Sequence, residues 1–139
     1  MEVTANSIQT VLTGQNILFT DTSICGNCSI IHRSGSGLIT VKGNTSQYRA
    51  RYRVSFNGNI AIPTGGTVGE ISLAVAMEGE IIPVTTMIVT PAAVEEYFNV
   101  FTTTFVDTMR DCCATITVKN TSDQSINVQN ANFIIERVA

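Results

Sequence analysis

Strict alternation of apolar and polar residues across positions 48–57 is the feature that most constrains the fold. One set of side chains is apolar and would share one face of a strand: Tyr48, Ala50, Tyr52, Val54 and Phe56. The residues between them are polar or basic, and residues two apart on a strand point the same way. The pattern predicts a long, half-buried strand with a fixed register. Asn57-Gly58 is a turn dipeptide, although the strand could continue past it to Ile60.

Short β-branched and aromatic runs recur along the rest of the chain, separated by Gly, Pro, Asn and Ser. We expect strands near residues 7–12, 16–20, 29–32, 38–41, 70–77, 81–89, 94–106, 113–119, 125–129 and 132–138. Glu78-Gly79 predicts a hairpin. A helix over residues 91–96 is the alternative there, because Pro suits a first helical turn. About ten strands with frequent turns predict an all-β, antiparallel sandwich, and 139 residues favour a jelly roll over an immunoglobulin sandwich.

The length is that of one domain, residues 1–139, and no repeat or linker divides it. Residues 1–6 are expected to form a flexible N-terminal arm. No apolar run reaches the roughly 18 residues that a membrane span needs, so we expect no membrane span. The N-terminal residues lack the basic and apolar regions of a signal peptide. The expectation is a chain used where it is made, or carried out inside an assembly.

Charged residues make up only 14% of the chain, and the formal net charge is −3. So low a charge density indicates a large buried fraction or a surface covered by partner subunits. The one basic cluster, Arg49, Arg51 and Arg53, would share a strand face. We interpret it as a solvated face or an inter-subunit ion-pair row, with a phosphate or sialic acid contact as the alternative. Nucleic acid is not an expected partner, because the chain lacks a wider basic footprint.

Four cysteines offer several chemistries. Cys25 and Cys28 have the spacing of a zinc half-site, but Cys112 and Cys113 are adjacent and would point to opposite faces of a strand. We favour disulfides, within the 25–28 turn or between it and the 112–113 strand. Free or buried thiols and a metal site remain alternatives.

The sequence shows no recognisable set of catalytic residues. His32 is the only histidine, and no serine has the setting of a nucleophile. Glycosidase chemistry needs two carboxylates that face each other across a cleft. Glu78 and Glu80 flank a turn, and the sequence gives no reason to place either of them opposite a second acid in a cleft. We therefore expect no enzyme, no catalytic residue, no cofactor and no metal.

Several stretches resemble a known family. They are the aromatic-Arg-Val-Ser-Phe strand at 52–56, the Gly-rich break after it, the hairpin at 78–80 and the final strand at 132–139. Together they resemble the complement-type and tumour-necrosis-factor-like jelly roll. They are most similar to its bacterial and phage versions, including the heads of spore-surface collagen-like glycoproteins. Residues 62–67 and 88–94 resemble stretches in proteins of gut Clostridia and their phages.

The resemblance implies a ten-strand sandwich, a tight homotrimer, and a role in binding or coat building. Residues 1–139 contain no run of the Gly-X-Y triplets that form the collagen-like stalk of the spore and complement proteins, so we expect a head without that stalk. We therefore expect a virion protein, a trimeric capsid decoration or head-fibre protein of a phage seated on a capsid lattice. The alternative is a receptor- or glycan-binding head of a tail fibre or of a cell or spore surface protein, located outside the cell. The residues expected at the trimer interface are aromatic: Tyr48, Tyr52, Phe56, Tyr97 and Phe101.

Overall fold

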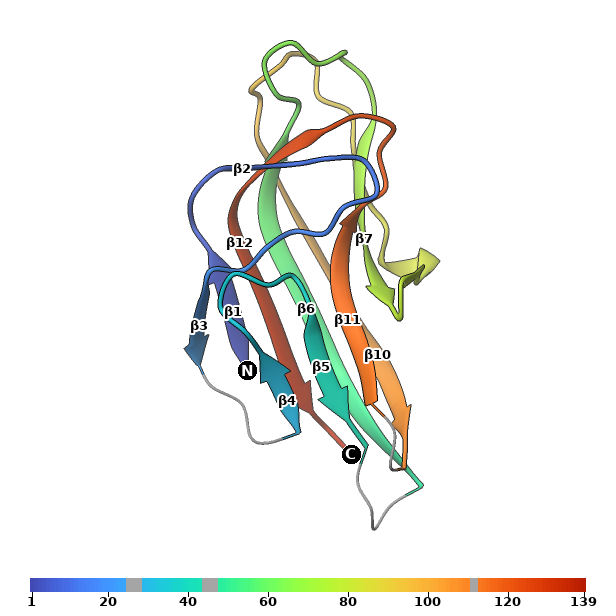
Figure 1. Ribbon diagram of the computed structural model, residues 1–139. Coiled ribbons are helices and arrows are strands. Elements are labelled where there is room, and N and C mark those ends of the chain that lie inside the picture. Colours follow the sequence, from blue (N-terminus) through green and yellow to red (C-terminus); the bar gives the residue numbers. More distant parts are fainter. Residues whose placement is uncertain (25–28, 44–47, 111–112) are drawn as a thin grey trace.

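The computed structural model describes residues 1–24, 29–43, 48–110 and 113–139. Within these ranges the strands form two antiparallel sheets that stack face to face (Figure 1). Sheet A runs from edge to edge through β10 (Phe98–Met109), β6 (Arg49–Ala61), β12 (Ile126–Arg137), β1 (Glu2–Ala5) and β3 (Asp21–Ile24), and β2 (Gln9–Val11) pairs with β12. Sheet B runs through β4 (Ile30–His32), β5 (Ile39–Lys42), β11 (Cys113–Asn120), β7 (Ile71–Met77) and β8 (Glu80–Ile81), and β9 (Met87–Val89) pairs with β7. The predicted all-β antiparallel sandwich is confirmed.

The long strand predicted from alternation is β6, which lies between β10 and β12 in sheet A. Its inward residues are fully buried: Ala50, Tyr52, Val54 and Phe56. The buried Tyr52 hydroxyl donates a 2.6 Å hydrogen bond to the Lys42 carbonyl on β5, which joins the two sheets. As expected, the strand continues through Gly58, where a Cβ would lie 3.1 Å from the Phe56 ring.

The core fills the space between the sheets and is centred on three phenylalanines. Phe19 and Phe133 stack with ring centroids 5.8 Å apart, and Phe56 meets Phe133 edge-to-face at 6.2 Å. Aromatic pairs of this kind add stability beyond their buried area. Around them lie Ile and Val side chains from both sheets.

The N-terminal residues do not form the flexible arm that the sequence suggested. β1 pairs with β12 on one side and with β3 on the other, and Val3 is fully buried. The strand exists because two neighbours satisfy its backbone groups. Residues 16–20 were expected as a strand, but they make only one isolated bridge, Asn16 to Lys119.

The apolar run at 81–89 is broken rather than continuous. The hairpin at Glu78-Gly79 forms as predicted, since Met77 pairs with Glu80. A 3-10 turn, η1 (Pro83–Thr85), then separates β8 from β9. Pro has no amide hydrogen for a ladder, and the Thr85 hydroxyl accepts the hydrogen bond from the Val75 amide in place of a strand partner.

Two further boundaries differ from the expectation. The helix alternative at 91–96 is absent: this segment is irregular, and the strand of sheet A begins only at Phe98. The last two expected strands are one strand, β12, with a bulge between Gln129 and Asn132. Asn130 takes a positive φ of 55° there, which Asn tolerates better than most residues.

Candidate interaction surface

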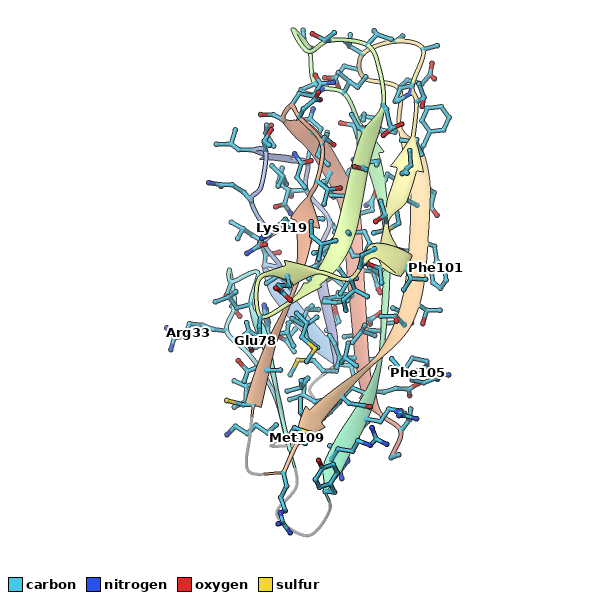
Figure 2. All side chains as sticks on the ribbon, turned by 90° about the vertical axis from the view of Figure 1, so that its right-hand side faces the viewer. Arg33, Glu78, Phe101, Phe105, Met109 and Lys119 are labelled. Atoms are coloured by element: carbon cyan, nitrogen blue, oxygen red, sulfur yellow. The ribbon has the colours of Figure 1, made fainter. Side chains whose placement is uncertain are left out.

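Three apolar side chains project into solvent from one face of β10. Phe101, Phe105 and Met109 are 61%, 58% and 47% exposed. They are four residues apart, so they share the outer face of sheet A and follow one another down the strand (Figure 2). We call these three residues the β10 stripe. Thr103 and Asp107 alternate with them on the same face. Exposed Phe and Met side chains are enriched where proteins contact one another.

β10 is an edge strand, which makes the stripe more unusual. All twelve of its residues pair with β6, and its other edge pairs with no strand in the described part of the chain. Proteins usually protect such edges with Lys, Pro or bulges. β10 has none of these and carries one charge, Asp107. The stripe therefore lies on the outer face of a strand that pairs only with β6 in the described part of the chain.

Polar and charged groups run beside the stripe on β6. Opposite Phe105 lies Arg53, and opposite Met109 lies Arg49. The Arg51 guanidinium donates two hydrogen bonds to the Asp107 carboxylate, Nε to Oδ1 at 2.8 Å and Nη2 to Oδ2 at 3.1 Å. Because Asp107 lies between Phe105 and Met109 on β10, the ion pair separates two members of the stripe.

The three arginines are paired within the chain. Arg49 reaches the same Asp107 carboxylate at 3.3 Å, and Arg53 bonds Glu136 on β12. The hydrogen bond from Arg51 lowers the pKa of Asp107, an effect that partial desolvation opposes and the charges of Arg51 and Arg49 reinforce. The same contact raises the pKa of Arg51. The predicted common face is confirmed, and its positive charge is largely used inside one chain.

The five residues expected at a trimer interface separate into three groups. Tyr52 and Phe56 are fully buried in the core, so placing them at an interface is wrong: the inward face of β6 packs against sheet B. Tyr48 is 70% exposed just before β6 and Phe101 belongs to the β10 stripe, so both are accessible. Tyr97 is half-buried in the segment before β10.

The five interface residues expected from the sequence did not include Phe105, Met109 or Ile134, which lies on β12. Ile134 is exposed on the same face of sheet A, across from Ser55 of β6. The signal was present, because Phe101, Phe105 and Met109 all have odd numbers in one strand and share their parity with Asp107. A charged residue at that parity marks the solvent face.

A second group of exposed apolar side chains lies on the β8–η1–β9 edge. It consists of Ile81, Val84 and Ile88, and we call it the edge patch. β9 and η1 lie against β10, so the edge patch is close to the stripe but belongs to the other sheet. The β10 stripe and the edge patch are thus two different groups of exposed apolar side chains, one on each sheet.

Among the described residues, the other side chains considered for chemistry form no reactive or metal-binding site. His32 is satisfied on both ring nitrogens, by Thr22 Oγ1 at 2.8 Å and by the Ser36 carbonyl at 2.9 Å. Cys113 is exposed at the start of β11. Three other cysteines of the predicted disulfides lie outside the described residues: Cys25, Cys28 and Cys112.

Residues 1–24, 29–43, 48–110 and 113–139 contain no cluster of three metal-ligating side chains. Within the same ranges, no helix is long and apolar enough to cross a membrane.

No protein-family model matches the chain, and no curated protein matches its sequence. Solved structures do match it. The globular domain of zebrafish complement 1qA is 11% identical, with a TM-score of 0.61 over 96% of this chain and 93% of that one. Eiger TNF from S. frugiperda is 9% identical, with a TM-score of 0.70 over 100% and 92%.

Murine APRIL is also similar, at 10% identity and a TM-score of 0.60 over 95% of each chain. The fold is the complement 1q and TNF-like jelly roll. At such low identity the likeness of this jelly roll to the three structures establishes the architecture, and it confirms the fold expected from the sequence. The bacterial or phage type of the resemblance stays a prediction.

Proposed function

We propose that this jelly roll is a non-enzymatic head that assembles with copies of itself, as a homotrimer, and works as a structural or binding unit. One observation carries the proposal: the β10 stripe exposes two phenylalanines and a methionine on a long strand at the end of sheet A. Covering that stripe with a second copy removes apolar area from water. Contact with partner subunits would also account for the low share of charged residues, 14% of the chain.

The two apolar surfaces suit a ring. A contact between the β10 stripe of one chain and the edge patch of the next joins unlike surfaces, and such head-to-tail contacts close when the rotation between copies matches the ring size. The resemblance to complement and TNF-like heads implies three copies. Three identical contacts would then bury all three stripes.

As the specific role, we propose a virion structural protein, a capsid decoration or head-fibre protein of a phage. A closed three-fold trimer matches local three-fold points of a capsid lattice. The described residues also show no arrangement of side chains that is typical of a catalytic site. Sequencing the neighbouring genes tests this role. A capsid gene beside the coding sequence supports it, and a neighbourhood without virion genes counts against it.

The alternative is a receptor- or glycan-binding head at an extracellular or spore surface. A polar cleft at one end of the sandwich favours it and is described below. A glycan array without a binding partner for the assembled protein would count against this alternative.

Self-assembly is tested by the mass of the chain in solution. Sedimentation velocity at micromolar concentration should give the mass of three 14.9 kDa chains. A single 14.9 kDa species over the whole concentration range would overturn the proposal.

A further inference from the structure

A polar cleft of about 610 Å³ opens at the end of the sandwich away from both termini. Its walls are residues 67–70, which lead into β7, and residues 121–124, which follow β11, with Ser72 between them. Ligand pockets commonly measure about 300–1,000 Å³. The cleft lies at the strand ends of sheet B, so it is separate from the β10 stripe on sheet A.

The Gln124 side chain ties the two walls together. Its amide nitrogen donates to the Thr67 carbonyl at 2.7 Å, and its amide oxygen accepts from the Thr67 backbone N–H at 3.0 Å. This pair of bonds imitates one step of a β-ladder between two loops. The walls are therefore held at a fixed separation before any ligand arrives, which lowers the entropy cost of binding.

Buried hydrogen bonds fix the floor. Ser122 accepts from the Ser72 amide at 2.8 Å and donates to the Ser72 carbonyl at 3.1 Å. Behind it lies the buried side-chain amide of Asn120. Its Nδ2 donates to the Gln124 backbone carbonyl at 3.0 Å, and its Oδ1 accepts from the Ser122 backbone N–H at 2.8 Å. Fully satisfied networks of this kind are rigid.

The groups that remain available are mostly acceptors. Glu70 and Asp123 are exposed carboxylates at the rim, and neither has an ion-pair partner among the described residues. The hydroxyls of Ser72 and Thr121 share one 2.6 Å hydrogen bond, which leaves one of their two protons to donate elsewhere. No Lys or Arg lines the cleft.

We infer that this cleft binds a neutral or amino sugar. Sugar hydroxyls and an ammonium group supply the donors that two carboxylates require. The spare proton of the Ser72–Thr121 pair and the Thr67 hydroxyl, which also lines the cleft, can donate to sugar oxygens. Sialic acid and phosphate do not fit, because no cation in the lining would offset their charge. The lining has no aromatic side chain on which a sugar ring could rest, so we expect a dissociation constant of about 1 mM or weaker per site.

The inference goes beyond the proposed self-assembly and does not depend on it. Amide NMR spectra of the isotope-labelled full chain are recorded during titration with methyl glucoside, methyl mannoside, methyl galactoside and glucosamine. Sialic acid and calcium chloride are titrated separately. We expect at least one of the four sugars to shift the amides of residues 67–72 and 121–124.

The Glu70→Gln, Asp123→Asn double variant removes both charges from exposed positions, so it should fold. We expect it to bind the sugar at least tenfold more weakly. Glu80→Gln, which removes an exposed carboxylate on β8 outside the cleft, should bind as the parent chain does. Unchanged amide positions outside the cleft serve as the check on folding.

Three results would overturn the inference. They are no shift of these amides by any of the four sugars, saturation by calcium or sialic acid while the sugars do nothing, and full affinity in the double variant. Each can occur with the protein trimeric or monomeric, so failure here is distinct from failure of the self-assembly proposal.

Discussion

The sharpest consequence of the self-assembly proposal concerns the two phenylalanines of the β10 stripe. Phe101→Thr and Phe105→Thr each remove an exposed ring while retaining a residue that favours strands. Thr already occupies the neighbouring outward position, Thr103. The fold of one chain should therefore persist, with its free energy of unfolding changed by no more than about 0.5 kcal/mol.

The magnitude follows from the exposed area. A phenylalanine presents about 200 Å² when fully accessible, so Phe101 at 61% and Phe105 at 58% exposure each offer about 120 Å² to a partner. At about 25 cal/mol per Å², full burial of one ring contributes up to about 3 kcal/mol to association. We expect each substitution to cost about 2–3 kcal/mol per contact, or about a 30- to 150-fold weaker association constant.

Sedimentation equilibrium across a dilution series measures this change directly. Ile31→Thr is the matched control, because Ile31 is an exposed apolar residue on an outward position of β4 in the other sheet. It should associate as the parent chain does. The reasoning is refuted if both phenylalanine variants assemble at parental strength, or if Ile31→Thr weakens assembly as much as they do.

Three further predictions concern stability, measured by urea denaturation. Phe133→Ala removes a ring at the centre of the core and should cost about 3–5 kcal/mol; a loss below about 1 kcal/mol would contradict the packing. Gly37→Ala would bring a Cβ within 2.5 Å of a backbone oxygen and should cost about 1–3 kcal/mol, whereas Gly69→Ala meets nothing within 4 Å and should leave the midpoint nearly unchanged. Asp107→Asn should cost less than about 1 kcal/mol, because the Arg51 contact is exposed. Since that contact lowers the pKa of Asp107, the difference should be complete above the ordinary value of about 3.9 and disappear as pH falls through the folded value; a difference that grows in acid would refute it.

Alternation predicted β6 well because period two is imposed by the strand itself. The same rule separates the inward Tyr52 and Phe56 from the outward Arg51 and Arg53. It cannot say which aromatic residues lie beneath a second sheet and which face another chain. Tyr52 and Phe56 were therefore assigned to an interface although sheet B covers them.

β1 and β3 were harder to predict because their stability comes from neighbours. Residues 2–5 and 21–24 are short, and their composition is mixed. Their backbone groups are satisfied by a distant strand, β12, and by each other. Strand preference depends strongly on such context. Residues 2–5 and 21–24 therefore could not be identified as strands from their own sequence.

The end cleft could not be predicted from sequence at all. Its walls are about fifty residues apart, as the bond between Ser72 and Ser122 shows. Only the register of β7 against β11, with Leu73 opposite Asn120, brings Glu70 and Asp123 to one opening. In the sequence both carboxylates look like ordinary solvated residues of turns.

The central claim is that the β10 stripe is covered by another copy of the chain. Hydroxyl-radical footprinting read by mass spectrometry tests it most directly, because it reports the accessibility of Phe101, Phe105 and Met109 themselves. At concentrations that favour assembly, all three should be labelled several-fold more slowly than after strong dilution, while Ile31 stays unchanged. Equal labelling of the three side chains at every concentration would contradict the account.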